Sequence, residues 1–184
     1  PCSSFSMAGS REKAWGKNKK FREGQAHQVL DDLFFHFIET AKMLQPKIVV
    51  AENVKGLLIG KAKGYVKQIA QAFDLAGYDL QLFLLNAAFM GVPQRRERSF
   101  FIAKKKSIKW PRLELIFNEK PISFFDATAD LKLNFHETLT PTAEKYWHKC
   151  EPGKSFSSIH EKGSLFNWIK IDVNRPLPTM ASGN

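Results

Sequence analysis

The sequence predicts an α/β fold joined to a smaller, irregular second domain. Over roughly the first hundred residues, two amphipathic helical patterns alternate with three short apolar runs, which is typical of an α/β sheet. From about residue 107 onward no long amphipathic period survives, and Pro, Asn, Phe and Trp become frequent. We therefore expect a sheet-based domain over residues 1–106 and a second domain over residues 107–184.

Two helices are expected in the first domain. Residues 28–44 carry apolar side chains at helical spacing, and Pro46 marks the end of this helix. Residues 65–76 form the second pattern, and Gly77 gives it a stop signal. The residues before the first helix, 7–25, are rich in Lys, Arg and Gly and are expected to form a basic loop.

Three strands complete the expected order of helix, strand, helix, strand and strand. The run 48–51 is short, apolar and β-branched, so it fits a buried parallel strand. Residues 78–85 and 99–103 are the other two strands.

The composition indicates a soluble, basic protein. The 184 residues are 43% hydrophobic and 25% charged, and the net charge of +10 favours a polyanionic partner over the alternative of a merely solvated basic surface. Two cysteines imply no disulfide scaffold and favour a reducing, intracellular setting. No apolar run approaches the ~20 residues that span a bilayer, so no membrane partner is expected.

Cys2 is a candidate nucleophile. It follows a proline and precedes a hydroxyl-rich stretch. A deprotonated, accessible thiol attacks electrophiles readily. The alternative, a small buried side chain, is the commoner fate of a lone cysteine, and these residues alone leave both open.

Glu52 is a candidate acid. It directly follows the run 48–51 and is therefore expected at the carboxyl end of a strand, where open α/β sheets bind ligands. A partly buried carboxyl group there can share or donate a proton. The alternative is a surface or helix-capping carboxylate. Asn53 and Val54, followed by Gly56, indicate a tight turn after the strand.

Residues 94–98 read Gln-Arg-Arg-Glu-Arg. Alternate side chains of an extended segment share a face, so Gln94, Arg96 and Arg98 are expected to align. One amide and two guanidinium groups would suit phosphate or base oxygens. A charged edge strand is the alternative.

Taken together, these segments resemble the DNA (cytosine-5)-methyltransferase family. The similar motifs are Pro1-Cys2 with Phe5-Ser6 (Pro-Cys-x-x-Phe-Ser), Glu52-Asn53-Val54 (Glu-Asn-Val) and Gln94-x-Arg96-x-Arg98 (Gln-x-Arg-x-Arg). Asn86 and Gly91-Val92-Pro93 resemble the lead-in to the last motif, and residues 175–179 resemble the stretch that leads back into the conserved domain. Leu33-Phe34 resembles a further element, although Leu30-Asp31-Asp32 stands where that element has an arginine.

The resemblance implies a part of a Rossmann-like, S-adenosylmethionine-dependent methyltransferase sheet, with a target-recognition domain at 107–184. It implies that a cytosine is flipped out of duplex DNA and attacked at carbon 6 by Cys2, so that carbon 5 accepts the methyl group. Glu52 would hydrogen-bond the ring, and Arg96 would contact the base oxygen and help to orient Glu52.

The resemblance also implies supporting roles. Pro1 and Leu33 are expected near the cofactor, and no metal is expected. DNA contacts are expected from Ser3, Ser4, Ser6, Gln94 and Arg98, and structural roles from Asn53, Gly91 and Pro93. For Arg98 an architectural role is the alternative.

The family's Phe-x-Gly-x-Gly loop, which holds S-adenosylmethionine, does not occur in this sequence. The chain therefore resembles the middle of a restriction-modification or phage-type enzyme of the bacterial cytoplasm. We expect it to be inactive alone and to be completed by a missing N-terminal segment or a complementary subunit. The alternatives are a catalytically inactive DNA-binding fragment and an enzyme that methylates RNA.

Overall fold

The structure is a computed structural model that describes residues 18–19, 28–29, 32–59, 62–132, 139–165 and 167–180. The chain divides into two compact units. Unit 1 comprises Pro1–Leu85 with Glu97–Leu115, and unit 2 comprises Asn86–Arg96 with Ile116–Asn184. This division differs from the single boundary expected after residue 106, because the segment Asn86–Arg96 belongs with the second unit.

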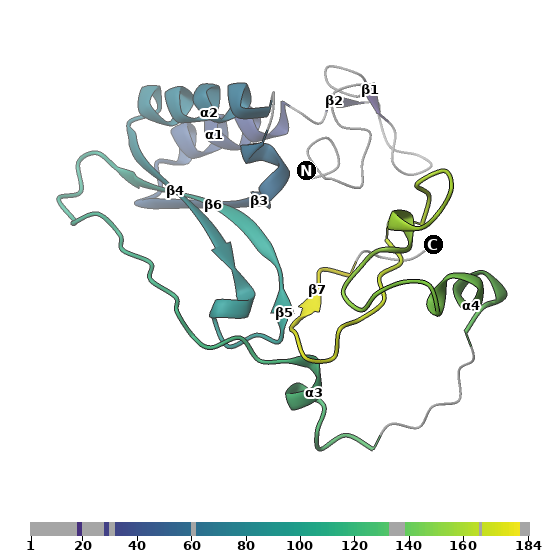
Figure 1. The fold of residues 1–184 in the computed structure, drawn as a ribbon. Helices are drawn as coiled ribbons and strands as arrows, with labels where there is room; N and C mark the ends of the chain where they lie inside the picture. The colour runs from purple at the N-terminus through teal and green to yellow at the C-terminus, as the bar shows by residue number, and fades with distance from the viewer. Residues whose placement is uncertain are drawn as a thin grey trace. The chain divides into compact units, whose positions relative to one another are not determined.

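Unit 1 is built on a three-stranded sheet with the strand order β3-β6-β4 (Figure 1). The strands are β3 (Ile48–Val54), β4 (Tyr78–Asn86) and β6 (Glu97–Lys105). β3 and β6 run antiparallel, from Ile48 opposite Lys104 to Val54 opposite Arg98.

The expectation of a buried parallel strand at 48–51 is wrong. β3 runs three residues further, is paired antiparallel with β6, and ends the described strand order. Its side chains alternate, with Val49 buried and Val50 56% exposed. The reason is that helices cover one face of this sheet, so that only every second residue of β3 is buried.

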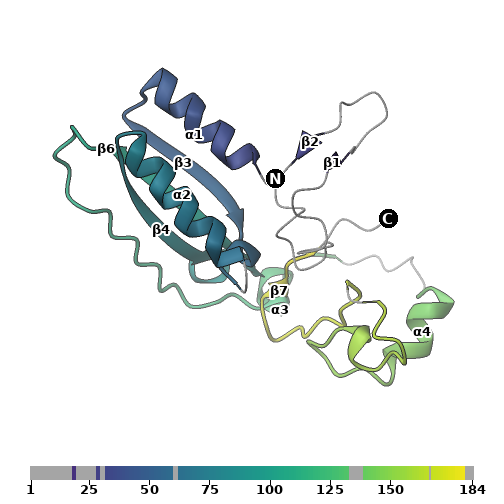
Figure 2. The same cartoon turned by 90° about the horizontal axis from the view of Figure 1, so that it is seen from above.

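Two helices, α1 (Leu33–Leu44) and α2 (Lys63–Leu75), lie on the same face of this sheet (Figures 1 and 2). The expected order of helix, strand, helix, strand and strand is confirmed over residues 33–105. The expected stop at Gly77 is also confirmed, since its φ is +89° and its N–H donates to Asp74 O at 3.1 Å.

The first helix begins five residues later than expected. Gln28–Val29 is strand β2, which pairs antiparallel with β1 (Asn18–Lys19). Local pairing therefore overrides the helical spacing of the first residues of the pattern.

Aromatic side chains form the centre of the unit 1 core. The Phe34 ring of α1 meets the Phe101 ring of β6 edge-on, with centroids 4.9 Å apart. Phe73 of α2 contacts both Phe34 and Tyr78 in the same manner. Phe73 and Phe101 are fully buried, so this cluster fixes β6 against both helices.

Tyr78 joins the core to the loop that precedes β3. Its hydroxyl donates to Pro46 O at 2.9 Å and approaches Ala41 O at 3.3 Å. Burial raises the pKa of the Tyr78 phenol. The neutral form is therefore the one that the fold stabilises.

Unit 2 has little regular structure, as the sequence texture predicts. Its helices are η4 (Ala87–Phe89), α3 (Phe124–Ala127), α4 (Pro141–Trp147) and η5 (Phe156–Ser158), and its strands are β5 (Gln94–Arg95) and β7 (Leu177–Pro178). A small core of Ala143, Cys150 and Phe156 is packed by Tyr146, Trp147 and Leu165. Side-chain oxygens of Ser123, Thr140 and Ser155 cap three of the helices.

In the described part of the chain, no helix has the length and apolar character needed to cross a membrane. The same residues contain no group of three His, Cys, Asp or Glu placed to hold a metal ion.

Candidate active site

Glu52 lies within β3 and not directly after it. The strand continues through Asn53 and Val54 because β6 pairs along the whole segment. Glu52 stands opposite Phe100, and Arg98 stands opposite Val54. Glu52 and Arg98 are therefore diagonal neighbours on one face of the sheet, within reach of long side chains.

An ion pair joins these two side chains. Arg98 Nε lies 2.8 Å from Glu52 Oε1, and the arginine side chain is 19% exposed while the glutamate is 48% exposed. Arg98 also donates through Nη1 to Glu97 O at 2.9 Å, which fixes the guanidinium plane. Arg98 thus holds Oε1 of Glu52, and none of the described residues bonds Oε2.

The arginine that pairs with Glu52 in the structure is Arg98, whereas the role of orienting Glu52 was expected for Arg96. Arg98 was expected to contact DNA. Arg96 belongs to unit 2, and Arg98 belongs to unit 1 with Glu52.

Two buried polar residues support the end of β3. Asn53 is 5% exposed, and its Oδ1 accepts from the N–H of Val54 at 2.8 Å. The fully buried Ser99 hydroxyl donates to Asn53 O at 3.1 Å. These contacts support a structural role for Asn53. No role was predicted for Ser99, whose only signal in the sequence is a hydroxyl directly before the apolar run 100–103 of β6.

A second ion pair, also missed from the sequence, flanks the first. Lys55 Nζ lies 2.8 Å from both carboxylate oxygens of Glu97. Lys55 begins η2 (Lys55–Leu58), directly after β3. Only the antiparallel register brings this lysine to Glu97, so spacing along the chain could not have found the pair.

Leu33 is the first residue of α1 and is half-buried. Its neighbour Phe34 packs into the unit 1 core, whereas Leu33 is not part of that cluster. Asp32 precedes it and makes no side-chain capping bond. A cofactor contact by Leu33 stays a prediction.

The segment Asn86–Arg96 of unit 2 forms a turn that hydrogen bonds close. Asn86 Oδ1 accepts from Ala88 N at 3.1 Å, and Ala87 N donates to Arg96 O at 3.1 Å. Gly91 has a φ of +76°, which favours glycine. These contacts support a structural role for Gly91.

The segment 175–179 returns to this turn. In β5 and β7, which are parallel, Gln94 stands opposite Leu177. Leu177 N donates to Pro93 O at 3.0 Å, and Thr179 Oγ1 donates to Arg95 O at 2.8 Å. The structure thus joins the lead-in to the Gln-x-Arg-x-Arg motif with the stretch that was expected to lead back into the conserved domain.

The expected single extended segment from Gln94 to Arg98 is interrupted. β5 ends at Arg95, and β6 begins at Glu97. Arg96 lies between the strands and is exposed. The common face predicted for Gln94, Arg96 and Arg98 therefore has no continuous strand to support it.

Five sequence-predicted residues lie outside the described residues. They are Pro1, Cys2, Ser3, Ser4 and Ser6. Most of the expected basic loop 7–25 also lies outside them.

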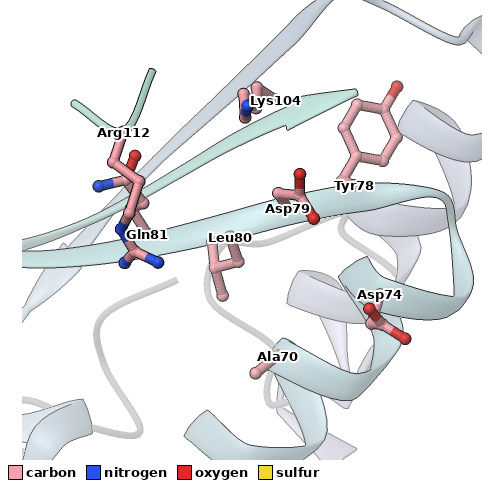
Figure 3. Close-up of a pocket in the computed structure, with 8 residues that line it drawn as sticks. All are labelled: Ala70, Asp74, Tyr78, Asp79, Leu80, Gln81, Lys104 and Arg112. Carbon is pink, nitrogen blue, oxygen red and sulfur yellow. The ribbon is translucent and has the colours of Figure 1, made fainter. Parts of the chain in front are cut away.

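A cavity of about 440 Å³ lies at the edge of β4, lined by Ala70, Asp74, Tyr78, Asp79, Leu80, Gln81, Lys104 and Arg112 (Figure 3). Figure 3 shows Leu80 on the side of β4 that faces α2, and Asp79 on the other side. Lys104 stands opposite Ile48, whereas Arg98 stands opposite Val54. The cavity therefore lies at the other end of the sheet from Glu52 and is distinct from the candidate active site.

Comparisons with known proteins agree with this geometry. The family model for C-5 cytosine-specific DNA methylases matches residues 1–173. The type II methyltransferase M.NgoPII of Neisseria gonorrhoeae is 32% identical over 183 residues, which are 95% of this chain and 47% of that protein. The orphan methyltransferase M.SPRI of Bacillus phage SPR is 40% identical over 123 residues, which are 66% of this chain and 25% of that protein.

A solved structure supports the fold. It is described as a DNA modification methyltransferase encoded within an E. coli prophage, and it matches with a TM-score of 0.58 and 20% identity, covering 81% of this chain and 57% of that one. The chain spans about half or less of the length of the two sequence relatives. Because the family model matches almost the whole chain, the chain belongs to the C-5 cytosine-specific DNA methylase family.

Proposed function

We propose that this chain supplies the catalytic and target-recognition part of a DNA cytosine-5 methyltransferase. The observation that carries the proposal is the Glu52–Arg98 ion pair at the end of β3, in a chain of this family. A half-exposed carboxylate held by a guanidinium on one side can engage a base with its other oxygen.

Cys2 is the proposed nucleophile. Its thiolate attacks carbon 6 of a cytosine that has left the stack, a step that costs a few kcal/mol of unstacking. The new carbon–sulfur bond turns carbon 5 into a nucleophile. After carbon 5 has gained the methyl group, it loses its proton to a base and Cys2 leaves, which restores the ring double bond.

Glu52 is proposed to stabilise the attacked ring. Its free oxygen would accept a hydrogen bond from the amino group and would stabilise a proton at nitrogen 3 as Cys2 adds. Arg98 positions the carboxylate through the sheet register. Arg96 remains the residue proposed for the base oxygen, and Gln94, Ser3, Ser4 and Ser6 for DNA contacts.

S-adenosylmethionine would supply the methyl group. Of the described residues, Leu33 is the one proposed to lie beside it, and the chain has no Phe-x-Gly-x-Gly loop. The residues present therefore make only a small part of a cofactor site. We expect this chain alone to bind S-adenosylmethionine weakly, and micromolar binding by calorimetry would contradict that.

We further propose that a cofactor-binding segment or subunit covers the open face of the unit 1 sheet. That face carries the exposed side chains of Ile48 and Val50 beside Ile102, and α1 and α2 lie on the opposite face (Figure 1). Exposed apolar sheet surface of this kind is costly in water. Val50→Lys should weaken assembly with a polypeptide that carries the missing loop, measured by size-exclusion chromatography, whereas the Lys42→Ala control on α1 should not.

The nucleophile is tested by covalent trapping on a duplex containing 5-fluorocytosine, with the complete enzyme and S-adenosylmethionine. The wild type should form a stable protein–DNA adduct, because fluorine at carbon 5 blocks the release of Cys2. Cys2→Ser should form none. Cys150→Ser is the matched control, since that thiol is buried in unit 2, and trapping should persist. An adduct on Cys2→Ser would identify another nucleophile.

The carboxylate is tested by Glu52→Gln. The amide keeps the size of the side chain but loses the charge that Arg98 pairs with, so methyl transfer should fall by about 10²–10⁴-fold. Glu97→Gln is the matched control, because it breaks the neighbouring pair with Lys55 and leaves Glu52 in place. Equal losses in both variants would mean that Glu52 acts only through the fold.

The relatives named above come from a bacterium and a phage. We propose a bacterial or phage-encoded enzyme of restriction-modification type that acts on duplex DNA in the cytoplasm.

A further inference from the structure

His160 sits in unit 2, two residues after η5, with its ring locked by the main chain. The N–H groups of Lys162 and Ser164 both donate to its Nδ1 atom, at 3.1 and 3.3 Å. A nitrogen that accepts these bonds carries no proton. The neutral imidazole therefore carries its hydrogen on Nε2.

The packing around the ring fixes its direction as well. The Tyr146 ring lies 5.3 Å from the His160 ring, centroid to centroid, and Tyr146 packs against the small core of unit 2. The loop backbone is held in an unusual conformation, with Leu165 at a φ of +66° and its side chain packed on the same core. Such strain persists only where the surroundings over-determine it.

Nε2–H is thus a rigidly presented donor. Among the described residues, none accepts from it. Lys162 is exposed beside it, and exposed Lys145 places Nζ 5.3 Å from the Tyr146 ring centre. Exposed lysines thus belong to the loop and to the helix that hold the His160 and Tyr146 rings, and lysines commonly contact phosphates in protein–DNA interfaces.

The charge balance of residues 116–184, the larger part of unit 2, points the same way. From residue 116 to 184, eight Lys and Arg are matched by eight Asp and Glu, so the net charge of the chain comes from the residues before 116. This region therefore contributes little non-specific attraction to phosphates. Neutral donors in fixed positions are what it can offer to a polyanion.

We propose that His160 determines target specificity by donating Nε2–H to the N7 or O6 acceptor of a guanine in the major groove. Guanine offers two acceptors side by side there, more than any other base. The inference rests on the proposed function and names one residue of the recognition surface.

The test is a binding selection with the full chain on a randomised duplex library, followed by anisotropy on the enriched duplex and on its single-base-pair variants. H160N keeps an inward oxygen near the Nδ1 position and removes the outward donor. It should lose about tenfold or more of the discrimination at one G·C pair, with unchanged affinity for non-cognate duplex and an unchanged thermal midpoint. H148N, at an exposed histidine of the same unit, is the matched control and should behave as wild type.

Each outcome decides the matter. An enriched sequence that H160N reads as well as the wild type would overturn this inference alone, as would an equal loss on all duplexes. A wild-type chain that enriches no sequence would overturn the proposal that this chain recognises the target DNA, and this inference with it. If H160N fails to fold, H160Q decides, because its amide reaches the outward position. Retained preference for the G·C pair supports the role of His160, and lost preference overturns it.

Discussion

The two units of this chain hold their functional groups in different ways. In unit 1 a strand ladder sets the positions, since Glu52 and Arg98 meet because β3 and β6 are in register. In unit 2 short caps and turns set them, since Asn86, Ser155 and His160 each bond nearby main-chain groups. A ladder is cooperative over many residues, whereas each cap holds a few residues and can change without disturbing the others.

The difference suits the two proposed tasks. The proposed attack on a base needs a carboxylate in a fixed position, and the sheet of unit 1 supplies one. Reading a DNA sequence differs between enzymes, and turns tolerate substitution better than strands. We therefore expect the stability of the two units to respond differently when single side chains are shortened, and the following variants test this.

The largest effect should come from Phe101→Ala. Phe101 is fully buried against Phe34, so its removal should lower the free energy of unfolding of unit 1 by about 4 kcal/mol. Urea titration followed by far-UV circular dichroism reports α1 and α2. Val50→Ala, on the exposed face, should change the midpoint little.

A smaller effect is expected from Phe156→Ala in unit 2. The small cluster around Phe156 can collapse onto Tyr146, so the loss should be about 3 kcal/mol. Fluorescence of Trp147 and Trp168 should follow this transition, and the far-UV midpoint of unit 1 should stay in place. A common shift of both signals would show that the units unfold as one.

Ser99→Ala should cost about 1 to 2 kcal/mol, because it removes a buried donor to Asn53 O. It should also loosen the end of β3, and hence reduce methyl transfer by the complete enzyme about tenfold. Thermal unfolding and initial rates measure the two effects. The exposed Ser107→Ala variant serves as control, and a stability loss without any rate loss would separate the strand end from the chemistry.

The smallest effect should come from Tyr78→Phe, at about 1 kcal/mol near neutral pH. Because burial raises the pKa of Tyr78, the folded state keeps the phenol proton more tightly than the unfolded state. Stability from this group is therefore present below about pH 10 and is lost as the pH rises through the raised pKa. Denaturation series from pH 8 to 11.5 should show a steeper decline for the wild type than for the phenylalanine variant.

The helices and strands of unit 1 could be predicted from the sequence better than the pairing between strands and between side chains. α2 and β4 follow strong periodic patterns, and the structure differs from the predicted ends by two residues at most. β3 was predicted too short because Glu52 and Asn53 are polar, and pairing with β6 carries the strand past them. The exchange of Arg96 for Arg98 has the same origin, since only the register decides which arginine reaches Glu52.

The irregular character of unit 2 could be predicted from the sequence, but its individual helices and hydrogen bonds could not. Its helices have between three and seven residues, too short for a periodic pattern. The bonds that organise it, such as those to His160 Nδ1, depend on turn geometry and on a φ of +66° at a leucine, which no residue pattern signals.

The parallel pairing of β5 with β7 has a consequence for synthesis on the ribosome. All three strands of the unit 1 sheet are available once residue 105 has emerged, whereas Gln94 must wait for Leu177. At about 5–20 residues per second, several seconds separate the two events. The sheet can thus form first, whereas Gln94 and Arg95 can pair only after β7 has been synthesised.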